Sequence, residues 1–220
     1  MMAISELTSR FADPGRAEFG ISLWPSKRTA AWLLFWIAAI VLAFSLDGVV
    51  ADYFAQPWSS GQRKALVEAM RAWGEASTII VLLLGIWMVK PSERTKCIAI
   101  GLACIVASLS VSSLKPLTRR LRPAEVEARG LEGHWHLEGN ANSSFPSGHV
   151  ATAFSFARGM SLAYPPLRML SVVAASGTAL SRMADARHYL SDCLAGGLLG
   201  WAVATPIMQY FLRREKEMKS

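Results

Sequence analysis

Two long segments without charged residues constrain the fold of this chain more than any other feature. Residues 29–46 and 97–114 each contain 18 consecutive residues with no Asp, Glu, Lys or Arg. An α-helix rises about 1.5 Å per residue, so each segment would extend roughly 27 Å, close to the ~30 Å hydrocarbon core of a bilayer. Uncharged runs of this length are rare in soluble proteins, and they therefore indicate a membrane protein.

The composition agrees with membrane residence and limits the partners. Charged residues make up 18% of the 220 residues, whereas a typical soluble domain has about a quarter. The chain is long enough for one domain and too apolar to be disordered. Its formal net charge of +7 would suit nucleic acid, an anionic membrane surface or an anionic substrate. Because the apolar residues are concentrated in membrane-like segments, we expect a lipid bilayer and no nucleic acid as partner.

Four weaker apolar segments raise the number of expected spans to six. They cover residues 77–89, 150–164, 170–180 and 190–212. No segment alternates apolar and polar residues convincingly over the length of a strand. We therefore predict an all-α fold, a six-transmembrane-helix bundle. The first uncharged run is a poor match to a cleaved signal peptide, because its 18 residues exceed the usual apolar core of about 7–15.

Residues 62–73, between the first two spans, have the pattern of an amphipathic helix. Leu66, Met70 and Trp73 recur at intervals of four and three, while charged residues occupy other positions. Such a helix is suited to lie on a membrane surface. We therefore predict a surface amphipathic helix here, although a helix packed on the bundle would explain the pattern equally well.

The span count predicts the domain organisation. With the amino terminus in the cytoplasm, residues 1–28 form a cytoplasmic segment, residues 29–212 the membrane domain and residues 213–220 a cytoplasmic tail. Of the 23 Lys and Arg residues, 12 then lie inside, 10 outside and Arg158 within a span. By itself, 12 against 10 is a weak positive-inside bias. The outside cations cluster in two places, however, and this clustering needs an explanation of its own.

Three polar stretches at span ends lie on the same, outer side of the membrane under this count. Residues 115–122 contain four cations, residues 145–149 carry a Pro-Ser-Gly-His sequence at a helix start, and residues 181–192 combine an arginine, a histidine and an aspartate. Isolated cations at membrane-helix ends commonly reach towards the interface without further function. The occurrence of three such stretches on one side indicates a shared site.

The chemistry of these stretches converges on a phosphoryl group. Lysine and arginine stabilise the negative charge that spreads over a transferring phosphoryl group. Ser147 and Gly148 at a helix start offer backbone N–H groups to an anion. His149 and His188 can supply a nucleophile and a general acid. Asp192, four residues after His188, would face it on one helix and orient its imidazole.

Other polar or reactive residues give weaker signals. The three cysteines lie in apolar spans and are expected to be small buried hydrophobes. His134 and His136 are two potential ligands without a third, so no metal site is expected. Arg158 is best interpreted as a structural residue that is either paired or faces the bundle interior. Together with Asp192 it also leaves a membrane transporter open as an alternative function.

Eleven positions in the three stretches match a known three-part signature. They are Lys115, Arg122, Pro123, Pro146, Ser147, Gly148, His149, Ser181, Arg182, His188 and Asp192. In residue type and spacing, this set resembles the signature of the type-2 phosphatidic acid phosphatase superfamily. That family also includes soluble vanadium haloperoxidases, but the two uncharged spans and the short chain argue against that branch.

The resemblance implies a metal-independent phosphatase that needs no cofactor and forms a phosphohistidine intermediate. His188 would attack phosphorus, Asp192 would orient His188, and His149 would protonate the leaving oxygen. The remaining signature residues would bind the phosphoryl oxygens: Lys115, Arg122, Ser147, Gly148 and Arg182.

The resemblance also implies a phosphorylated lipid as substrate. Bacterial members of the family act on undecaprenyl pyrophosphate, phosphatidylglycerophosphate, phosphatidate or lipid A phosphates, and the signature does not separate these. The expected location is the inner membrane, with the active site facing the periplasm or the extracellular side. A phosphotransferase that uses the same site is an alternative, and the oligomeric state is left open.

Overall fold

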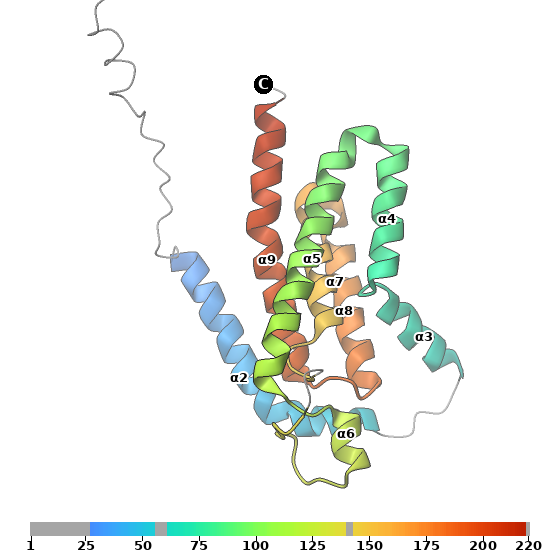
Figure 1. Cartoon of the computed structure of the whole chain (residues 1–220), viewed down its shortest axis with the longest axis vertical. Coiled ribbons are helices and arrows are strands. Elements are labelled where there is room, and N and C mark those ends of the chain that lie inside the picture. Colours follow the sequence, from blue (N-terminus) through green and yellow to red (C-terminus); the bar gives the residue numbers. More distant parts are fainter. Residues whose placement is uncertain (1–26, 56–60, 140–142, 219–220) are drawn as a thin grey trace, which may run out of the picture. The chain divides into compact units, whose positions relative to one another are not determined.

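The computed structural model describes residues 27–55, 61–139 and 143–218, and every regular element in these ranges is a helix (Figure 1). This confirms the predicted all-α class. The longer helices are α2 (Lys27–Ala55), α3 (Gly61–Ala72), α4 (Ala76–Val89), α5 (Arg94–Thr118), α6 (Pro123–Ala128), α7 (Gly148–Ala163), α8 (Arg168–Ala184) and α9 (Leu190–Glu217). Two short 3₁₀ helices, η1 (Pro91–Glu93) and η2 (Pro165–Leu167), precede α5 and α8.

The chain divides into two compact units, Met1–Phe35 and Trp36–Ser220. Apart from the first turns of α2, all of the described helices belong to the second unit. The second unit therefore contains the helix bundle and all three signature stretches. The predicted cytoplasmic segment 1–28 lies almost entirely outside the described residues, so that boundary stays a prediction.

The structure does not confirm the exact count of six spans. By length and composition, three of the described helices are able to cross a membrane, and α3 with α4, bent by 56°, would make a fourth if the pair is one span. Helices α7 and α8 have only 16 and 17 residues, somewhat short of the roughly 20 that a span needs. Helix α7 contacts α5, α8 and α9, so its side chains meet protein more than lipid and need not be uniformly apolar.

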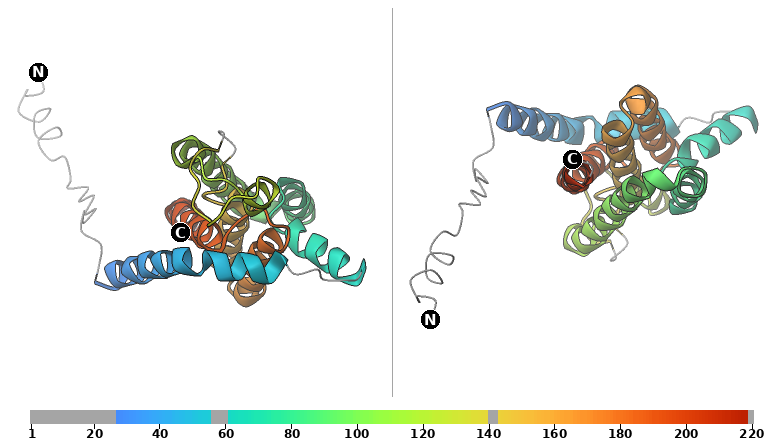
Figure 2. Two further views of the ribbon diagram at one scale, coloured as in Figure 1. Left: turned by 90° about the horizontal axis from the view of Figure 1, so that it is seen from below. Right: turned by 90° about the horizontal axis from the view of Figure 1, so that it is seen from above.

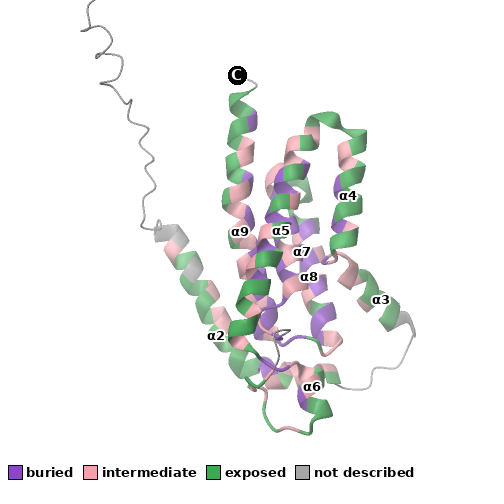
Figure 3. Cartoon of the chain, viewed as in Figure 1, coloured by how far each residue is buried: buried purple, intermediate pink, exposed green. Residues whose placement is uncertain are grey.

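Large apolar side chains are exposed along the outer helices. Val41 of α2, Val81 of α4 and Leu109 of α5 are all more than half exposed, and many of their neighbours resemble them (Figure 3). Water would make so extensive an apolar surface unfavourable, whereas the hydrocarbon core of a bilayer accommodates it. The arrangement therefore agrees with the predicted membrane protein.

The bundle is organised around α7, with α5, α8 and α9 beside it (Figure 2). Two glycines let α9 approach the backbone of α7 closely. A Cβ atom at Gly200 would lie 2.0 Å from the carbonyl oxygen of Ala151, and one at Gly196 would lie 2.4 Å from that of Ser147. Because these distances exclude any side chain, the glycines bring the first turn of α9 next to the start of α7.

Helix α3 confirms the predicted amphipathic helix between the first two apolar segments. It packs against α8, where the Thr178 hydroxyl donates a hydrogen bond of 3.0 Å to the carbonyl oxygen of Met70. The following turn passes close to α7, since a Cβ atom at Gly74 would lie 2.8 Å from the carbonyl oxygen of His149. The first contact holds α3 against α8 and the second holds its following turn near the start of α7, and both favour the interpretation of a helix packed on the bundle.

Candidate active site

The three signature stretches meet at one end of the bundle. Lys115 lies near the end of α5, Ser147 caps the start of α7, and Asp192 lies in the first turn of α9. The backbone N–H of Ser147 donates to the carbonyl oxygen of Asp192 at 3.0 Å. The Lys115 ammonium donates to the carbonyl oxygen of Ser143 at 2.9 Å, just before the second stretch. Hydrogen bonds therefore join elements that are far apart in the sequence.

His188 lies at the centre of this arrangement and is 3% exposed. Its Nδ1 atom is 2.8 Å from the carbonyl oxygen of Ser144 and 3.6 Å from a carboxylate oxygen of Asp192. A carbonyl oxygen only accepts hydrogen bonds, so Nδ1 carries the hydrogen in the neutral ring. The lone pair is then on Nε2, which is the tautomer that a nucleophilic histidine needs.

The expectation that His188 and Asp192 share one helix is wrong in detail. Helix α9 begins at Leu190, so His188 precedes it and only Asp192 is helical. A carboxylate oxygen of Asp192 accepts the backbone N–H of Tyr189 at 2.8 Å, as expected of an acidic residue in the first turn. The spacing of four residues thus brings the two side chains together through a helix cap instead of through a shared helix face.

The charge state of His188 favours nucleophilic attack. Burial lowers the pKa of His188 below its usual value of 6.5, and the nearby positive charges of Arg122 and Arg182 act in the same direction. The carboxylate of Asp192 opposes this effect. The lowered pKa means that the imidazole is neutral at neutral pH, with its lone pair available.

Asp192 is held by a set of donors that sequence reasoning missed. The Ser144 hydroxyl donates to one of its carboxylate oxygens, and Nη1 of Arg120 donates to the other at 2.8 Å. Arg120 is 1% exposed, and its Nη2 pairs with the buried carboxylate of Asp47 at 2.7 Å. Asp47 also accepts the backbone N–H of Ser191 at 2.9 Å. The structure thus contains a buried network that connects α2 with the first turn of α9.

A signal for this network was present in the sequence. Asp47 directly follows the first uncharged segment and lies within a helix of 29 residues. An acidic residue in an apolar helix generally has a buried partner or a function. The sequence groups Arg120 with three other cations around a phosphoryl group, whereas the structure places it in the buried network with Asp47 and Asp192. Arg119 is also outside the site, since it ends α5 with a left-handed backbone (φ 48°) and is exposed.

Two buried polar atoms of the site are left without a hydrogen-bond partner among the described residues. Nε of Arg182 and Oγ of Ser147 are buried and have no hydrogen-bond partner among the described residues. Nη1 of Arg182 lies 3.5 Å from the carboxylate of Asp185. Buried donors without partners are unfavourable unless a ligand satisfies them. Arg182 and Ser147 are among the residues predicted to bind the phosphoryl oxygens, and this role stays a prediction.

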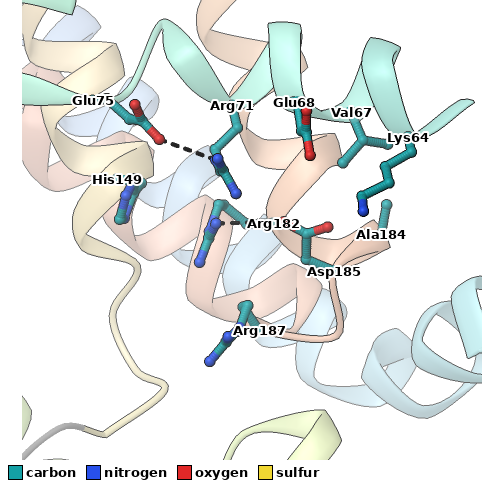
Figure 4. A pocket seen from close by; sticks show the side chains of 10 residues that line it. All are labelled: Lys64, Val67, Glu68, Arg71, Glu75, His149, Arg182, Ala184, Asp185 and Arg187. Carbon is teal, nitrogen blue, oxygen red and sulfur yellow. Dashed lines mark hydrogen bonds and ion pairs between the residues drawn. The ribbon is translucent and has the colours of Figure 1, made fainter. Parts of the chain in front are cut away.

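Two pockets meet at His149, the second residue of α7. One is a polar pocket of about 570 Å³ between α3 and the end of α8, which also includes Arg182 (Figure 4). The other is an apolar groove of about 590 Å³ along α4, α5 and α7, which includes Lys115 and Gly148. The predicted general acid therefore lies where a polar and an apolar compartment adjoin.

The other polar or reactive residues noted in the sequence make contacts that support the fold. Among the described residues, no three His, Cys, Asp or Glu side chains are placed to hold a metal ion. The carbonyl oxygen of His134 accepts a hydrogen bond from Arg120. Arg158 donates to the hydroxyl of Thr205 at 2.9 Å and lies over the ring of Trp201, so it is paired within the bundle. The three cysteines are buried and free.

Comparison with known proteins supports the resemblance noted above. Over 80% of this chain and 82% of the relative, the sequence is 26% identical to lipid A 1-phosphatase from Rhizobium etli. It is 39% identical to lipid A 1-phosphatase from Porphyromonas gingivalis over 31% of this chain, a match that spans only 16% of that longer protein.

The fold has a solved counterpart. The crystal structure of the transmembrane PAP2 type phosphatidylglycerolphosphate phosphatase from Bacillus subtilis superposes with a TM-score of 0.61, at 18% identity, over 84% of this chain and 96% of the other. All of these relatives are named phosphatases, which confirms the enzyme class that the sequence predicts. Residues 96–216, more than half of the chain, match the PAP2 superfamily, and the protein therefore belongs to that family.

Proposed function

We propose that the protein is a membrane lipid phosphatase that acts through a phosphohistidine intermediate on His188. The observation that carries this proposal is the buried imidazole whose Nδ1 is bound to a carbonyl oxygen and whose Nε2 keeps its lone pair. The adjacent buried donors of Arg182 and Ser147 suit the oxygens of a phosphoryl group.

In the first step, Nε2 of His188 forms a bond to phosphorus. The bond between phosphorus and the leaving oxygen breaks, and His149 gives its proton to that oxygen. Arg182, Lys115 and the Ser147–Gly148 backbone stabilise the charge on the phosphoryl oxygens, as does Arg122. Asp192 stabilises the positive charge that develops on the ring of His188.

In the second step, water hydrolyses the phosphohistidine. His149, now neutral, accepts a proton from the attacking water, and the P–N bond breaks as the new P–O bond forms. Inorganic phosphate leaves, while His149 regains its proton and His188 its neutral form. Each residue is thus ready for a new cycle.

The apolar groove supports a lipid as the substrate. Ile79, Leu83 and Ile105 line it, and it reaches Lys115 and His149 at the site. An acyl or prenyl chain would bury its surface there while the phosphate remains among the cations. Candidates are undecaprenyl pyrophosphate, phosphatidylglycerophosphate, phosphatidate and lipid A phosphates, and two relatives carry lipid A in their names. The location proposed for this reaction is the outer face of the inner membrane.

Two other functions make different predictions. A phosphotransferase would use the same histidines but pass the phosphoryl group to an alcohol in place of water. A transporter was suggested by Arg158 and Asp192, but both have protein partners within the bundle, so neither is available to line an ion pathway. The contacts of these two residues favour the enzyme.

Phosphate release from purified protein tests the proposal. Wild-type protein in detergent should release inorganic phosphate from at least one of the candidate lipids, and His188→Ala should lower the rate at least about a thousandfold. His136→Ala is a matched control, because His136 is a loop histidine outside the site. A phosphotransferase would instead place the phosphoryl group on an added alcohol. A full rate in His188→Ala would disprove the proposed mechanism.

A further inference from the structure

A separate apolar pocket lies at the end of the bundle opposite the candidate active site, where α4 leads into α5 and α7 into α8 (Figure 1). Helix α7 starts at the active site, and this pocket lies at its other end, roughly 24 Å away at 1.5 Å per residue. The pocket has a volume of about 400 Å³ and is lined by Gly85, Ile86, Val89, Lys90, Met160, Tyr164 and Leu167. Among the described residues, none of these lines either pocket at His149. The pocket is therefore distinct from the site of the proposed reaction.

The lining of this pocket is suited to an apolar chain. Apart from Lys90 and the hydroxyl of Tyr164, its side chains are apolar. Val89 at the rim is 77% exposed, and Leu167 is 39% exposed. In a membrane protein such a surface faces hydrocarbon, so a lipid chain can enter the pocket directly from the bilayer.

Gly85 leaves space in the pocket that the protein does not fill. A Cβ atom at this position would meet no atom of the described chain within 4 Å. This differs from Gly196 and Gly200, where the backbone of α7 excludes a side chain. Glycine is unfavourable inside a helix relative to alanine, and no close approach of the described helices requires it at Gly85. The space beside Gly85 is therefore available to a ligand.

The polar groups beside the pocket leave positive charge at its edge. The Tyr164 hydroxyl donates a hydrogen bond of 3.0 Å to Glu93, and Lys96 pairs with the same carboxylate oxygen at 2.7 Å. These contacts engage Glu93. Lys90 lines the pocket and is exposed, and Arg168, the residue after η2, is exposed as well. Two cations from different segments thus border an apolar pocket.

This combination matches a ligand that has both an apolar chain and an anionic group. A soluble anion would leave the apolar part of the pocket empty, and a lipid with a zwitterionic head would compensate the two cations only partly. Basic residues beside apolar surfaces at the ends of membrane helices attract anionic lipid headgroups. An anionic phospholipid satisfies both parts of the pocket at once.

We propose that the pocket between α4, α7 and η2 binds an anionic phospholipid, whose acyl chain lies beside Gly85 and whose phosphate contacts Lys90 and Arg168. With the topology predicted from the sequence, this lipid comes from the cytoplasmic leaflet, on the side of the membrane away from the substrate. The site takes no part in the two reaction steps, and the proposal does not depend on the proposed function.

Native mass spectrometry of the full chain in a non-ionic detergent tests the proposal. The probes are phosphatidylglycerol and phosphatidylcholine with identical acyl chains, and neither is a phosphomonoester. We expect wild-type protein to bind one phosphatidylglycerol at least about tenfold more tightly than phosphatidylcholine, and Lys90→Ala/Arg168→Ala to lose this preference. The matched control is Arg213→Ala/Lys216→Ala, which removes two exposed cations at the same end of the bundle and should keep the preference.

Filling the pocket provides a second test. Gly85→Leu places a side chain in the open space, so it should weaken the binding of phosphatidylglycerol at least about tenfold. The melting temperature of the lipid-free variant should stay close to that of the wild type, since the leucine meets no neighbouring atom at its Cβ. Gly85→Ala is the control for the loss of glycine itself and should retain the lipid.

Three results would overturn the lipid site: equal binding of the two lipids by wild-type protein, an equal loss of preference in Arg213→Ala/Lys216→Ala, or unchanged binding by folded Gly85→Leu. Excess glycerol 3-phosphate should not displace the bound lipid, and full displacement would indicate a site for free anions instead. None of these measurements uses phosphate release, so a failure of the proposed function would be seen separately.

Discussion

Two charged regions of the bundle lie side by side, and they differ in how their charges are satisfied. In the buried network, Arg120 binds the carboxylates of Asp47 and Asp192 with its two terminal nitrogens. Its guanidinium also lies 4.0 Å from the ring centroid of Tyr189. In the proposed phosphoryl site, Arg182 has one carboxylate partner at 3.5 Å and no aromatic ring stacked on it among the contacts of the described residues.

The difference separates a structural charge from a functional one. Each arginine keeps a buried Nε without a hydrogen-bond partner in the described part of the chain, but two carboxylates and an aromatic face compensate the charge of Arg120. The charge of Arg182 is only partly compensated, which suits a group that binds a phosphoryl group. Changing the first arginine should therefore affect folding, and changing the second should affect turnover.

The largest expected effect is that of Arg120→Met on stability. Removing this arginine leaves two carboxylates buried without their cation, which typically costs about 3–5 kcal/mol of folding free energy. The melting temperature in detergent should fall accordingly, and activity should fall with it. Adding Asp47→Asn to this variant should restore part of the stability, because one of the buried charges is then removed. A single variant with wild-type stability would contradict the proposed role of the network.

Arg182→Ala should lower turnover and leave stability nearly unchanged, the opposite of the effect expected for Arg120→Met. We expect kcat/KM to fall about 10²–10³-fold, the loss found when a donor to a developing negative charge is removed. The melting temperature should change little, since Arg182 makes a single long ion pair with the residues that the structure describes. Arg129→Ala is the control, because this arginine is exposed at the end of α6. A large loss of stability without a specific loss of turnover would remove the distinction between the two regions.

The pH dependence tests how Asp192 couples the two regions. Burial lowers the pKa of His188, and Asp192 counteracts this by favouring the protonated ring. In the proposed mechanism the neutral ring of His188 is the nucleophile, so kcat/KM should fall on the acid side only below the usual histidine pKa of 6.5. In Asp192→Asn, the opposing effect is absent, and this acid limb should move to lower pH while the maximal rate falls. Using the same substrate for both proteins cancels its own ionisation, and a limb that moved to higher pH would contradict the assignment.

Ser144→Ala should have the smallest effect of the four. The hydroxyl of Ser144 donates to Asp192, whereas the His188 contact comes from its backbone carbonyl. The substitution therefore removes one hydrogen bond, worth about 1 kcal/mol, and keeps the tautomer of His188. Turnover should fall about fivefold, with the acid limb in the same range. Complete inactivation would contradict this expectation, because the Ser144 hydroxyl would then do more than orient the carboxylate of Asp192.

The sequence could predict that the site lies at one end of the bundle, because the signature residues occur at helix ends. The helix start at Gly148 and the amphipathic α3 were also predictable from local patterns. The different roles of Arg120 and Arg122 could not be predicted from the sequence. These arginines are two residues apart in one basic stretch, and Arg119, which directly follows α5 within this stretch, has a left-handed backbone that no glycine signals.

The missing details depend on contacts between distant segments. The carbonyl oxygen that fixes the tautomer of His188 belongs to Ser144, 44 residues earlier. Asp47 lies 73 residues before its partner Arg120. Short apolar helices such as α7 also look like membrane spans in sequence, although neighbouring helices cover much of their surface. Periodicity and spacing describe local geometry, so they do not determine such pairings.

Trapping of the covalent intermediate tests the central claim most directly. Wild-type protein is mixed with a ³²P-labelled lipid phosphate that it hydrolyses and is quenched on the timescale of one turnover. We predict labelled protein whose label survives alkali and is released by acid, as expected of a P–N bond, and which is absent from His188→Ala. Label retained by His188→Ala, or phosphate release by the wild type without any labelled protein on that timescale, would contradict the account.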